Sequence, residues 1–275
     1  MRCLVVADLH YSLPQFDWLL SAAPQFDLVI FAGDALDVGS IVDFRAQIVV
    51  VKKYLSLLSG ITRVILCSGN HDLDEHSAEG EKISRWIGEV RELGIARDGD
   101  SLTIDDTLFT VCPWWDGPSV KQRLETQLQE ASAERPARWI WIHHAPPANS
   151  PTSWGGKRFF GDVELVQWIA RHQPLMVISG HVHQSPFIAD GSWFDRLGDT
   201  WVFNTGLQPG RPPTYIVLDF DEEKAFWLAA EDAQSIDLNA PLKRPAATIQ
   251  TAPPWLTSLD RIADPSRAKP ASAED

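Results

Sequence analysis

Short apolar runs alternate with longer segments of helical periodicity along the first half of the chain. The runs are rich in β-branched residues, as is typical of buried strands, and the longer segments repeat their apolar positions every three to four residues. We predict strands at 2–7, 28–32, 63–67 and 139–142 and helices at 14–22, 41–59, 79–92, 120–135 and 163–172. This alternation favours parallel strands covered by helices.

The second half of the chain contains shorter and more closely spaced apolar runs. Segments 101–104 and 107–111 form a predicted hairpin, and further strands are expected at 175–179, 185–189, 201–204, 214–220 and 224–229. Close spacing favours antiparallel pairing. Two mixed sheets packed face to face, with helices outside, accommodate both halves, so we predict an α/β fold in the form of a four-layer αββα sandwich.

The composition changes after residue 231. Residues 1–231 read as one folded domain, whereas 232–275 are rich in Pro, Ala and Ser around one apolar island at 254–262. We predict a C-terminal tail that is partly disordered or docked on the body through Trp255 and Leu256. A partner-binding or dimerising peptide is the alternative interpretation, and the oligomeric state stays open.

Charge and cysteine content narrow the class of protein. The 37 acidic and 24 basic residues give a net charge of −13, which argues against a protein that grips many nucleic-acid phosphates. No apolar run approaches the roughly 20 residues that cross a bilayer, and the N-terminus lacks the pattern of a secretion signal. The three cysteines are widely spaced, so neither a disulfide framework nor a cysteine zinc site is expected. These features predict a cytoplasmic protein without a membrane partner.

Five polar segments each follow a predicted strand directly. They are Asp8-Leu9-His10, Gly33-Asp34, Gly69-Asn70-His71-Asp72, His143-His144 and Gly180-His181-Val182-His183. Because ligands bind at the carboxyl ends of strands in α/β sheets, these side chains are expected to converge. A donor set of carboxylate, amide and imidazole groups suits Mn, Fe or Zn, and it suffices for two cations if Asp34 bridges them.

In this order, the five segments resemble the motif series of the calcineurin-like metallophosphoesterases: D-x-H, G-D-x-x-D, G-N-H-D, H-x-P-P and G-H-x-H. The match spans residues 8–183. The resemblance implies that Asp8, His10 and His183 hold one metal ion. It implies a second ion held by Asn70, His181 and one histidine of the 143–144 pair, with Asp34 shared. His144 is preferred over His143 because 144–147 fits H-x-P-P.

The resemblance also implies the chemistry. Residues 1–231 would be the catalytic domain of a dinuclear metal-dependent phosphoesterase, with Mn as the first choice of metal and Fe or Zn as alternatives. A metal-activated hydroxide would attack phosphorus, and His71 would protonate the leaving group. Asp72, assigned to the catalytic set beside it, would orient His71 or the neighbouring backbone. The protein serine/threonine phosphatase variants of these motifs are missing, which favours phosphodiesters over phosphomonoesters.

Loops between the motifs supply candidate substrate contacts. Trp114 and Trp115 follow a predicted strand, Arg158 lies in a segment rich in aromatic residues, and Arg211 lies in a loop after another strand. Aromatic faces stack on planar groups and the cations meet phosphate, although hydrophobic packing with solvent-facing cations is the alternative. The expected partner is a small phosphate ester, with nucleotides among the candidates. The alternative functions are a small nuclease acting on DNA or RNA ends and a non-catalytic phosphate-ligand binding protein of the same fold.

Overall fold

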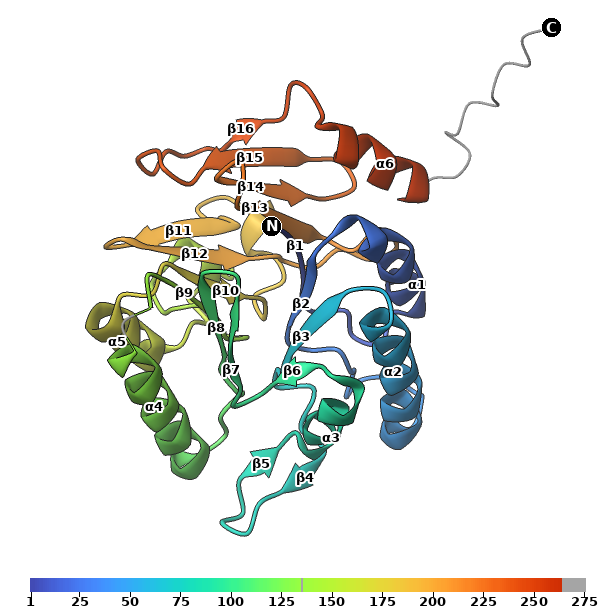
Figure 1. Ribbon diagram of the computed structural model, residues 1–275, viewed down its shortest axis with the longest axis vertical. Helices are drawn as coiled ribbons and strands as arrows, with labels where there is room; N and C mark the ends of the chain where they lie inside the picture. The colour runs from blue at the N-terminus through green and yellow to red at the C-terminus, as the bar shows by residue number, and fades with distance from the viewer. Residues whose placement is uncertain (135, 264–275) are drawn as a thin grey trace, which may run out of the picture.

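Two β-sheets pack face to face at the centre of the computed structural model, which describes residues 1–134 and 136–263. Helices cover the outer face of each sheet, so the molecule has four layers (Figure 1). The predicted order of helix, sheet, sheet and helix is therefore present. Among the described residues, helices are too short or too polar to cross a bilayer.

The first sheet has eight strands and is parallel in its centre. β1, β2, β3 and β6 run parallel, and β13 pairs antiparallel with β1. In spatial order the strands are β16 (Ala247–Thr248), β15 (Ala233–Asp237), β14 (Lys224–Leu228), β13 (Tyr215–Asp219), β1 (Arg2–Val6), β2 (Leu28–Ala32), β3 (Arg63–Cys67) and β6 (Ala96–Arg97).

The second sheet has six strands, with antiparallel strands at both edges. Its central strands β8, β9, β10 and β12 are parallel. In spatial order the strands are β11 (Phe194–Leu197), β12 (Thr200–Asn204), β10 (Met176–Ser179), β9 (Arg138–Ile142), β8 (Thr107–Val111) and β7 (Ser101–Ile104). A separate hairpin joins β4 (Glu75–His76) to β5 (Lys82–Ile83).

The helices divide between the two outer faces. The first sheet carries α1 (Leu13–Ala22), α2 (Phe44–Ser59), α3 (Arg85–Glu89) and α6 (Pro254–Ala263), and the second carries α4 (Pro118–Ala133) and α5 (Val163–His172). Short 3-10 helices occur at Ala23–Gln25, Val90–Leu93, Pro151–Ser153 and Ser185–Phe187. Alternate residues of β1 face the two sides of its sheet: Val5 joins the core between the sheets, and Leu4 joins the core under the helices.

Two local predictions were wrong, and a strand of the second sheet was missed. The helix expected at 79–92 is a hairpin strand followed by the short α3, because Gly80 has a φ of +83° and the chain turns back there. The strand expected at 185–189 is a 3-10 helix with Pro186 at its start. β11 was missed because Asp195 and Arg196 interrupt its apolar pattern.

The segment after residue 231 continues the first sheet. β15 pairs antiparallel with β14 across the predicted domain boundary, and α6 contacts α1. Leu256 is buried, and the Trp255 ring lies 6.5 Å from the Phe26 ring and 5.2 Å from the Phe226 ring, measured between centroids. The part of the predicted tail at 264–275 lies outside the described residues, and the division into domain and tail stays a prediction.

Glu81 caps α4 from a distant part of the chain, and this contact gives a stability prediction. Its side chain is 8% exposed and accepts hydrogen bonds from the backbone N–H groups of Ser119 at 2.6 Å and Val120 at 2.9 Å. Because Gly117, the N-cap residue, has no side chain to do this, Glu81→Ala is expected to lower the free energy of unfolding by about 1–2 kcal/mol. Denaturant unfolding measures the loss. The exposed Glu79→Ala is the control, and an equal loss in both variants would contradict the assignment.

Candidate metal centre

The predicted ligands converge from the two sheets. Asp8, Asp34 and Asn70 follow β1, β2 and β3 of the first sheet, and His144 and His181 follow β9 and β10 of the second. These strands are parallel within each sheet, so their carboxyl ends lie at one edge.

One cluster contains Asp8, His10 and His183. The Nε2 atoms of the two histidines are 3.1 Å apart, and Asp8 Oδ1 lies 3.2 Å from His183 Nε2 and 3.8 Å from His10 Nε2. One ligand atom from each residue lies within 4.8 Å of the others. These are the three residues that the resemblance assigns to a first cation.

A second cluster is built on Asp34 and His144. His144 Nε2 is 3.1 Å from Asp34 Oδ2 and 3.8 Å from Asp8 Oδ1, and all three side chains are buried. Beside them, Asn70 Oδ1 lies 2.9 Å from His181 Nδ1, and the His144 and His181 ring centroids are 5.2 Å apart. The structure therefore brings the predicted second set together, with Asp34 also 3.9 Å from His10 Nε2.

The structure distinguishes the two adjacent histidines. His143 Nε2 lies 3.1 Å from Asp162 Oδ2, away from the carboxylates of the clusters. His144 Nδ1 lies 2.7 Å from the carbonyl oxygen of Ala32. Because a carbonyl only accepts, Nδ1 carries a hydrogen and directs Nε2 toward Asp34, as is usual for a metal-binding histidine. The geometry thus favours His144 as the ligand.

Buried negative charge shapes the ionisation of the centre. Burial alone would lower the pKa of His144, but the carboxylates of Asp34 and Asp8 raise it to about 9. Burial likewise opposes ionisation of Asp34, yet the His144 ring holds the pKa of that carboxyl well below its usual range. For His181, burial followed by repulsion from His144 lowers the pKa to about 4. The buried carboxylates thus favour positive charge at this centre, and a divalent cation would supply it.

Four predicted ligands have positive φ angles, which residues other than glycine rarely adopt. The φ angles are +55° at Asp8, +42° at His10, +54° at Asp34 and +70° at His181. Each such residue costs roughly 1–3 kcal/mol, and such strain gathers at functional sites. Close packing adds to this, since a Cβ on Gly33 would lie 2.2 Å from the His144 ring and one on Gly69 would lie 2.1 Å from Asp34 Oδ1.

His71 lies beside the clusters and is oriented by the 36–38 turn. The backbone N–H of Val38 donates to its Nδ1 at 3.3 Å, and Asp37 Oδ1 is 3.7 Å from the same atom. The His71 and His10 ring centroids are 4.5 Å apart. Ligand atoms of His71, His10 and Asp34 also lie within 4.8 Å of one another, so the geometry permits His71 as a metal ligand as well.

Asp72 supports the backbone. Its buried carboxylate accepts hydrogen bonds from the N–H groups of Asp34 and Gly69, both at 2.8 Å, and of Leu36 at 3.0 Å. Of the two roles considered for it, the contacts match orientation of neighbouring backbone. These contacts suit a positioning role for Asp72, whose place in the catalytic set stays a prediction. Asp37 Oδ1 lies 3.7 Å from the His71 ring nitrogen.

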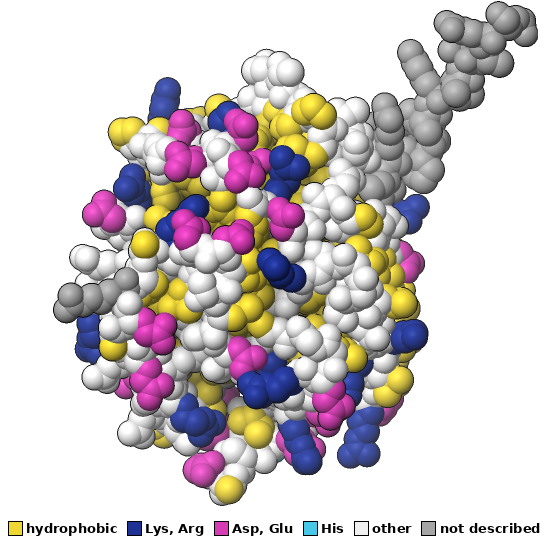
Figure 2. Space-filling view, in the orientation of Figure 1, with side chains coloured by type: hydrophobic (Ala, Val, Ile, Leu, Met, Phe, Trp, Pro, Cys, Tyr) yellow, Lys and Arg dark blue, Asp and Glu magenta, His cyan; other side chains and the backbone are white. Residues whose placement is uncertain are grey.

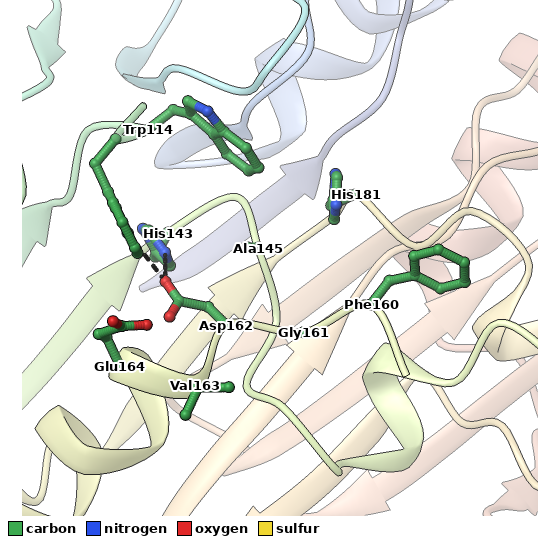
Figure 3. Close-up of a pocket in the computed structure, with 10 residues that line it drawn as sticks. Trp114, His143, Ala145, Phe160, Gly161, Asp162, Val163, Glu164 and His181 are labelled. Atoms are coloured by element: carbon green, nitrogen blue, oxygen red, sulfur yellow. Dashed lines mark hydrogen bonds and ion pairs between the residues drawn. The ribbon is translucent and has the colours of Figure 1, made fainter. Parts of the chain in front are cut away.

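A cavity of about 310 Å³, the aromatic cavity, adjoins the second cluster (Figure 3). The predicted substrate residues Trp114 and Trp115 line it, but Arg158 and Arg211 do not. Arg158 lies over the Phe160 ring, 4.6 Å from its centroid, and Arg211 is exposed on the loop after β12. The cavity is also lined by Phe160, Asp162 and Glu164, which were not among the predicted substrate residues. The adjacent phenylalanines at 159 and 160 were the available signal for Phe160, but no motif marked Asp162 or Glu164.

The donor atoms fit divalent cations. His144 Nε2 is buried and has no hydrogen bond of acceptable geometry among the described residues. The His10 and His183 ring nitrogens face each other although both rings also face carboxylates. Mixed oxygen and nitrogen donors without a thiolate match Mn, Fe or Zn.

Comparisons with known proteins bear on the family and the fold of this chain. The profile of a family described as calcineurin-like phosphoesterase matches residues 1–185. Protein TT1561 of Thermus thermophilus has a TM-score of 0.54 at 16% identity, covering 86% of this chain and 99% of that one. A dimetal phosphatase from Danio rerio has a TM-score of 0.53 at 11% identity, covering 87% and 99%.

The purple acid phosphatase PPD1 from yellow lupin (Lupinus luteus) seeds has a TM-score of 0.52 at 12% identity, covering 90% of this chain and 52% of that one. The comparison with curated proteins gave no match. At these identities the structural likeness concerns the fold, and it confirms the predicted α/β sandwich.

Proposed function

Because this chain belongs to the calcineurin-like phosphoesterase family, we propose that it is a dinuclear metal-dependent phosphoesterase that hydrolyses small phosphodiesters, with phosphomonoesters as poorer substrates. The observation that carries the proposal is the convergence of seven candidate ligands from two sheets. The cluster of Asp8, His10 and His183 shares Asp8 with the cluster of Asp34 and His144. Asp34 also belongs to a group with His10, which suits a pair of cations with a shared carboxylate.

The residues divide between the two cations as follows. Asp8, His10 and His183 would hold one, and Asn70, His144 and His181 the other, with Asp34 between them. Mn is the proposed metal, with Fe or Zn as alternatives. Bound there, two divalent cations would polarise the phosphoryl oxygens and lower the pKa of a water molecule.

His71 is the proposed general acid. The Val38 N–H group donates to Nδ1, so Nε2 of the neutral ring carries the hydrogen and is able to donate to a phosphoryl oxygen. The imidazolium form, which is the proton donor, would exchange the hydrogen bond from Val38 for one from Nδ1–H to Asp37 Oδ1, 3.7 Å away, and its Nε2 proton would be available to the leaving oxygen. Asp72 holds the turns that carry Asp34 and His71 in place through its three backbone hydrogen bonds.

Charge near the centre supports diesters over monoesters. A diester carries one negative charge, whereas a monoester carries up to two near neutral pH. Among the described residues that line the aromatic cavity, Asp162 and Glu164 are acidic and none is lysine or arginine. The nearby cations have other partners, since Lys121 pairs with Glu164 at 2.7 Å and Arg158 stacks on Phe160. The dianion of a monoester would therefore find less compensation.

A nucleic-acid substrate has less support. The net charge is −13, and acidic and basic side chains are interspersed on the face seen in Figure 2. Nucleic-acid binding depends on many phosphate contacts to clustered cations. We therefore propose a small substrate and a cytoplasmic location, which the three free, buried cysteines support.

Hydrolysis of model esters tests the proposal. Protein loaded with Mn is expected to hydrolyse bis(4-nitrophenyl) phosphate with a higher kcat/KM than 4-nitrophenyl phosphate. His144→Ala should lower metal content and reduce kcat/KM by about 100-fold, equal to about 2.7 kcal/mol. His143→Ala, its neighbour on the same turn, should retain both metals. Absence of hydrolysis with Mn, Fe and Zn alike, together with tight phosphate-ester binding, would instead indicate a non-catalytic binding protein.

A further inference from the structure

The aromatic cavity lies directly beside the candidate metal centre. We propose that it binds a planar, uncharged aromatic substituent of the phosphoester substrate. This inference rests on the proposed function and specifies the substrate class of the same site. The aromatic cavity has a volume of about 310 Å³, at the lower end of the range for ligand pockets, which suits a single aromatic group.

Trp114 joins the cavity to the metal centre. Its ring centroid lies 5.3 Å from that of His181 and 5.7 Å from that of His144. The backbone N–H of Trp114 donates to Ser68 Oγ at 2.8 Å, which ties the loop after β8 to the end of β3. A phosphoester whose phosphoryl group lies at Asn70 and His181 therefore has an indole face immediately beside it.

Phe160 forms the other aromatic wall. Figure 3 shows it on the opposite side of the cavity from Trp114, with the backbone at Ala145 and Gly161 between them. Its side chain is 41% exposed, but its backbone is fixed by the hydrogen bond from Phe160 N–H to the Ser153 carbonyl at 2.8 Å. Phe160 thus presents a partly exposed ring, with Arg158 over it, on a backbone segment that is anchored by a hydrogen bond.

The acidic side of the cavity disfavours a substituent that carries a phosphate group of its own. Asp162 accepts hydrogen bonds from Trp115 Nε1 at 3.1 Å and from the Leu165 N–H at 3.1 Å, and it faces His143 Nε2. These donors, together with His143, hold the pKa of Asp162 below its usual range although burial opposes this, so the carboxylate is charged at neutral pH. Glu164 adds a second carboxylate, paired with Lys121. These carboxylates, with no lysine or arginine among the described residues that line the cavity, disfavour an anionic substituent and leave stacking on the rings as the main attraction.

Binding of non-hydrolysable phosphonates tests the inference without turnover. The wild-type protein, saturated with Mn, is expected to bind phenylphosphonate at least about 10-fold more tightly than methylphosphonate in calorimetry, because stacking on an aromatic side chain contributes about 1–3 kcal/mol. Phe160→Ala should reduce this ratio at least about 5-fold, and Phe160→Leu should reduce it by less. Methylphosphonate affinity should change little in either variant.

Phe159→Ala is the matched control. Phe159 is adjacent, is 43% exposed and contacts the Trp154 ring, but it does not line the cavity. Trp114 is unsuitable because its ring contacts two candidate ligands. Equal affinity of the wild-type protein for both phosphonates, or an unchanged ratio in Phe160→Ala, would overturn the inference.

Two further measurements are informative. One distinguishes a nucleobase from a smaller aryl group as the occupant of the cavity, and the other separates this inference from the proposed function. Tighter binding of the phosphonate analogue of AMP than of phenylphosphonate would support the cavity as a site for a nucleobase. Weaker binding of the AMP analogue, with the phenyl preference intact, would support a smaller aryl group. Failure of the proposed function shows instead as absence of phosphoester hydrolysis, whatever the ratio of phosphonate affinities.

Discussion

Asp34→Asn is expected to lower kcat/KM for phosphodiesters by about 1,000-fold or more and to remove bound metal. Asp34 lies 3.1 Å from His144 Nε2 and 3.9 Å from His10 Nε2, so one carboxylate serves both clusters. Asparagine keeps the shape and can still accept the His71 N–H that now donates to Oδ1 at 2.8 Å, but it removes the charge. The predicted loss equals about 4 kcal/mol of transition-state stabilisation, in keeping with the several kcal/mol that metal ions supply.

Metal content by mass spectrometry and steady-state kinetics measure the two effects. The matched control is Asp219→Asn, a buried carboxylate of the same sheet that pairs with Arg2 at the opposite edge from the candidate centre. This control should lose stability but retain metal and kcat/KM. Full metal content and activity in Asp34→Asn would contradict the shared role of Asp34.

The convergence of the candidate ligands could be predicted from the sequence because each is tied to a local pattern. Asp8, Asp34, Asn70 and His181 each follow a parallel strand closely, and parallel strands place their carboxyl ends at one edge. The family profile over residues 1–185 confirms the resemblance drawn from these motifs. The individual roles of the ligands stay predictions. One cluster of the structure has the same three residues as the predicted first set, whereas another joins Asp8 to Asp34 and His144.

The aromatic cavity could not be derived in the same way. Phe160, Asp162 and Trp115 meet through the packing of loops from different strands, and no spacing in the sequence records such contacts. The same limit applies to Arg158, whose guanidinium stacks on Phe160 instead of lining the cavity. Glu81 is a further case, because its capping of α4 joins a hairpin to a helix that begins 37 residues later.

The role of Asp72 shows where a motif is ambiguous. The sequence left two roles open for Asp72, to orient His71 or to orient the neighbouring backbone. The turn directs its carboxylate to three backbone N–H groups. Asp37, in the separate G-D-x-x-D segment, lies closer to the ring nitrogen. Which carboxylate faces an imidazole depends on the turn conformation, and the left-handed backbone at Asp34 is part of that turn.

The role of His71 leads to the second large effect. His71→Gln is expected to keep both metal ions and to lower kcat by about 100- to 10,000-fold, the usual contribution of a general acid. The loss should be largest for diesters with poorly acidic leaving groups, since these depend most on protonation of the departing oxygen.

A series of aryl methyl phosphodiesters with leaving groups of increasing pKa measures this dependence, alongside metal analysis of the same preparations. Because His71 also lies within reach of the His10 and Asp34 donor atoms, the metal content decides between two roles. A variant that loses metal, with a uniform loss of kcat across the series, would make His71 a ligand and not the acid. Asp37→Asn provides the comparison, because it removes the charge 3.7 Å from Nδ1 while the Val38 N–H still orients the ring. Asp37→Asn should therefore show the same dependence of kcat on the leaving group as His71→Gln, with a smaller loss of kcat.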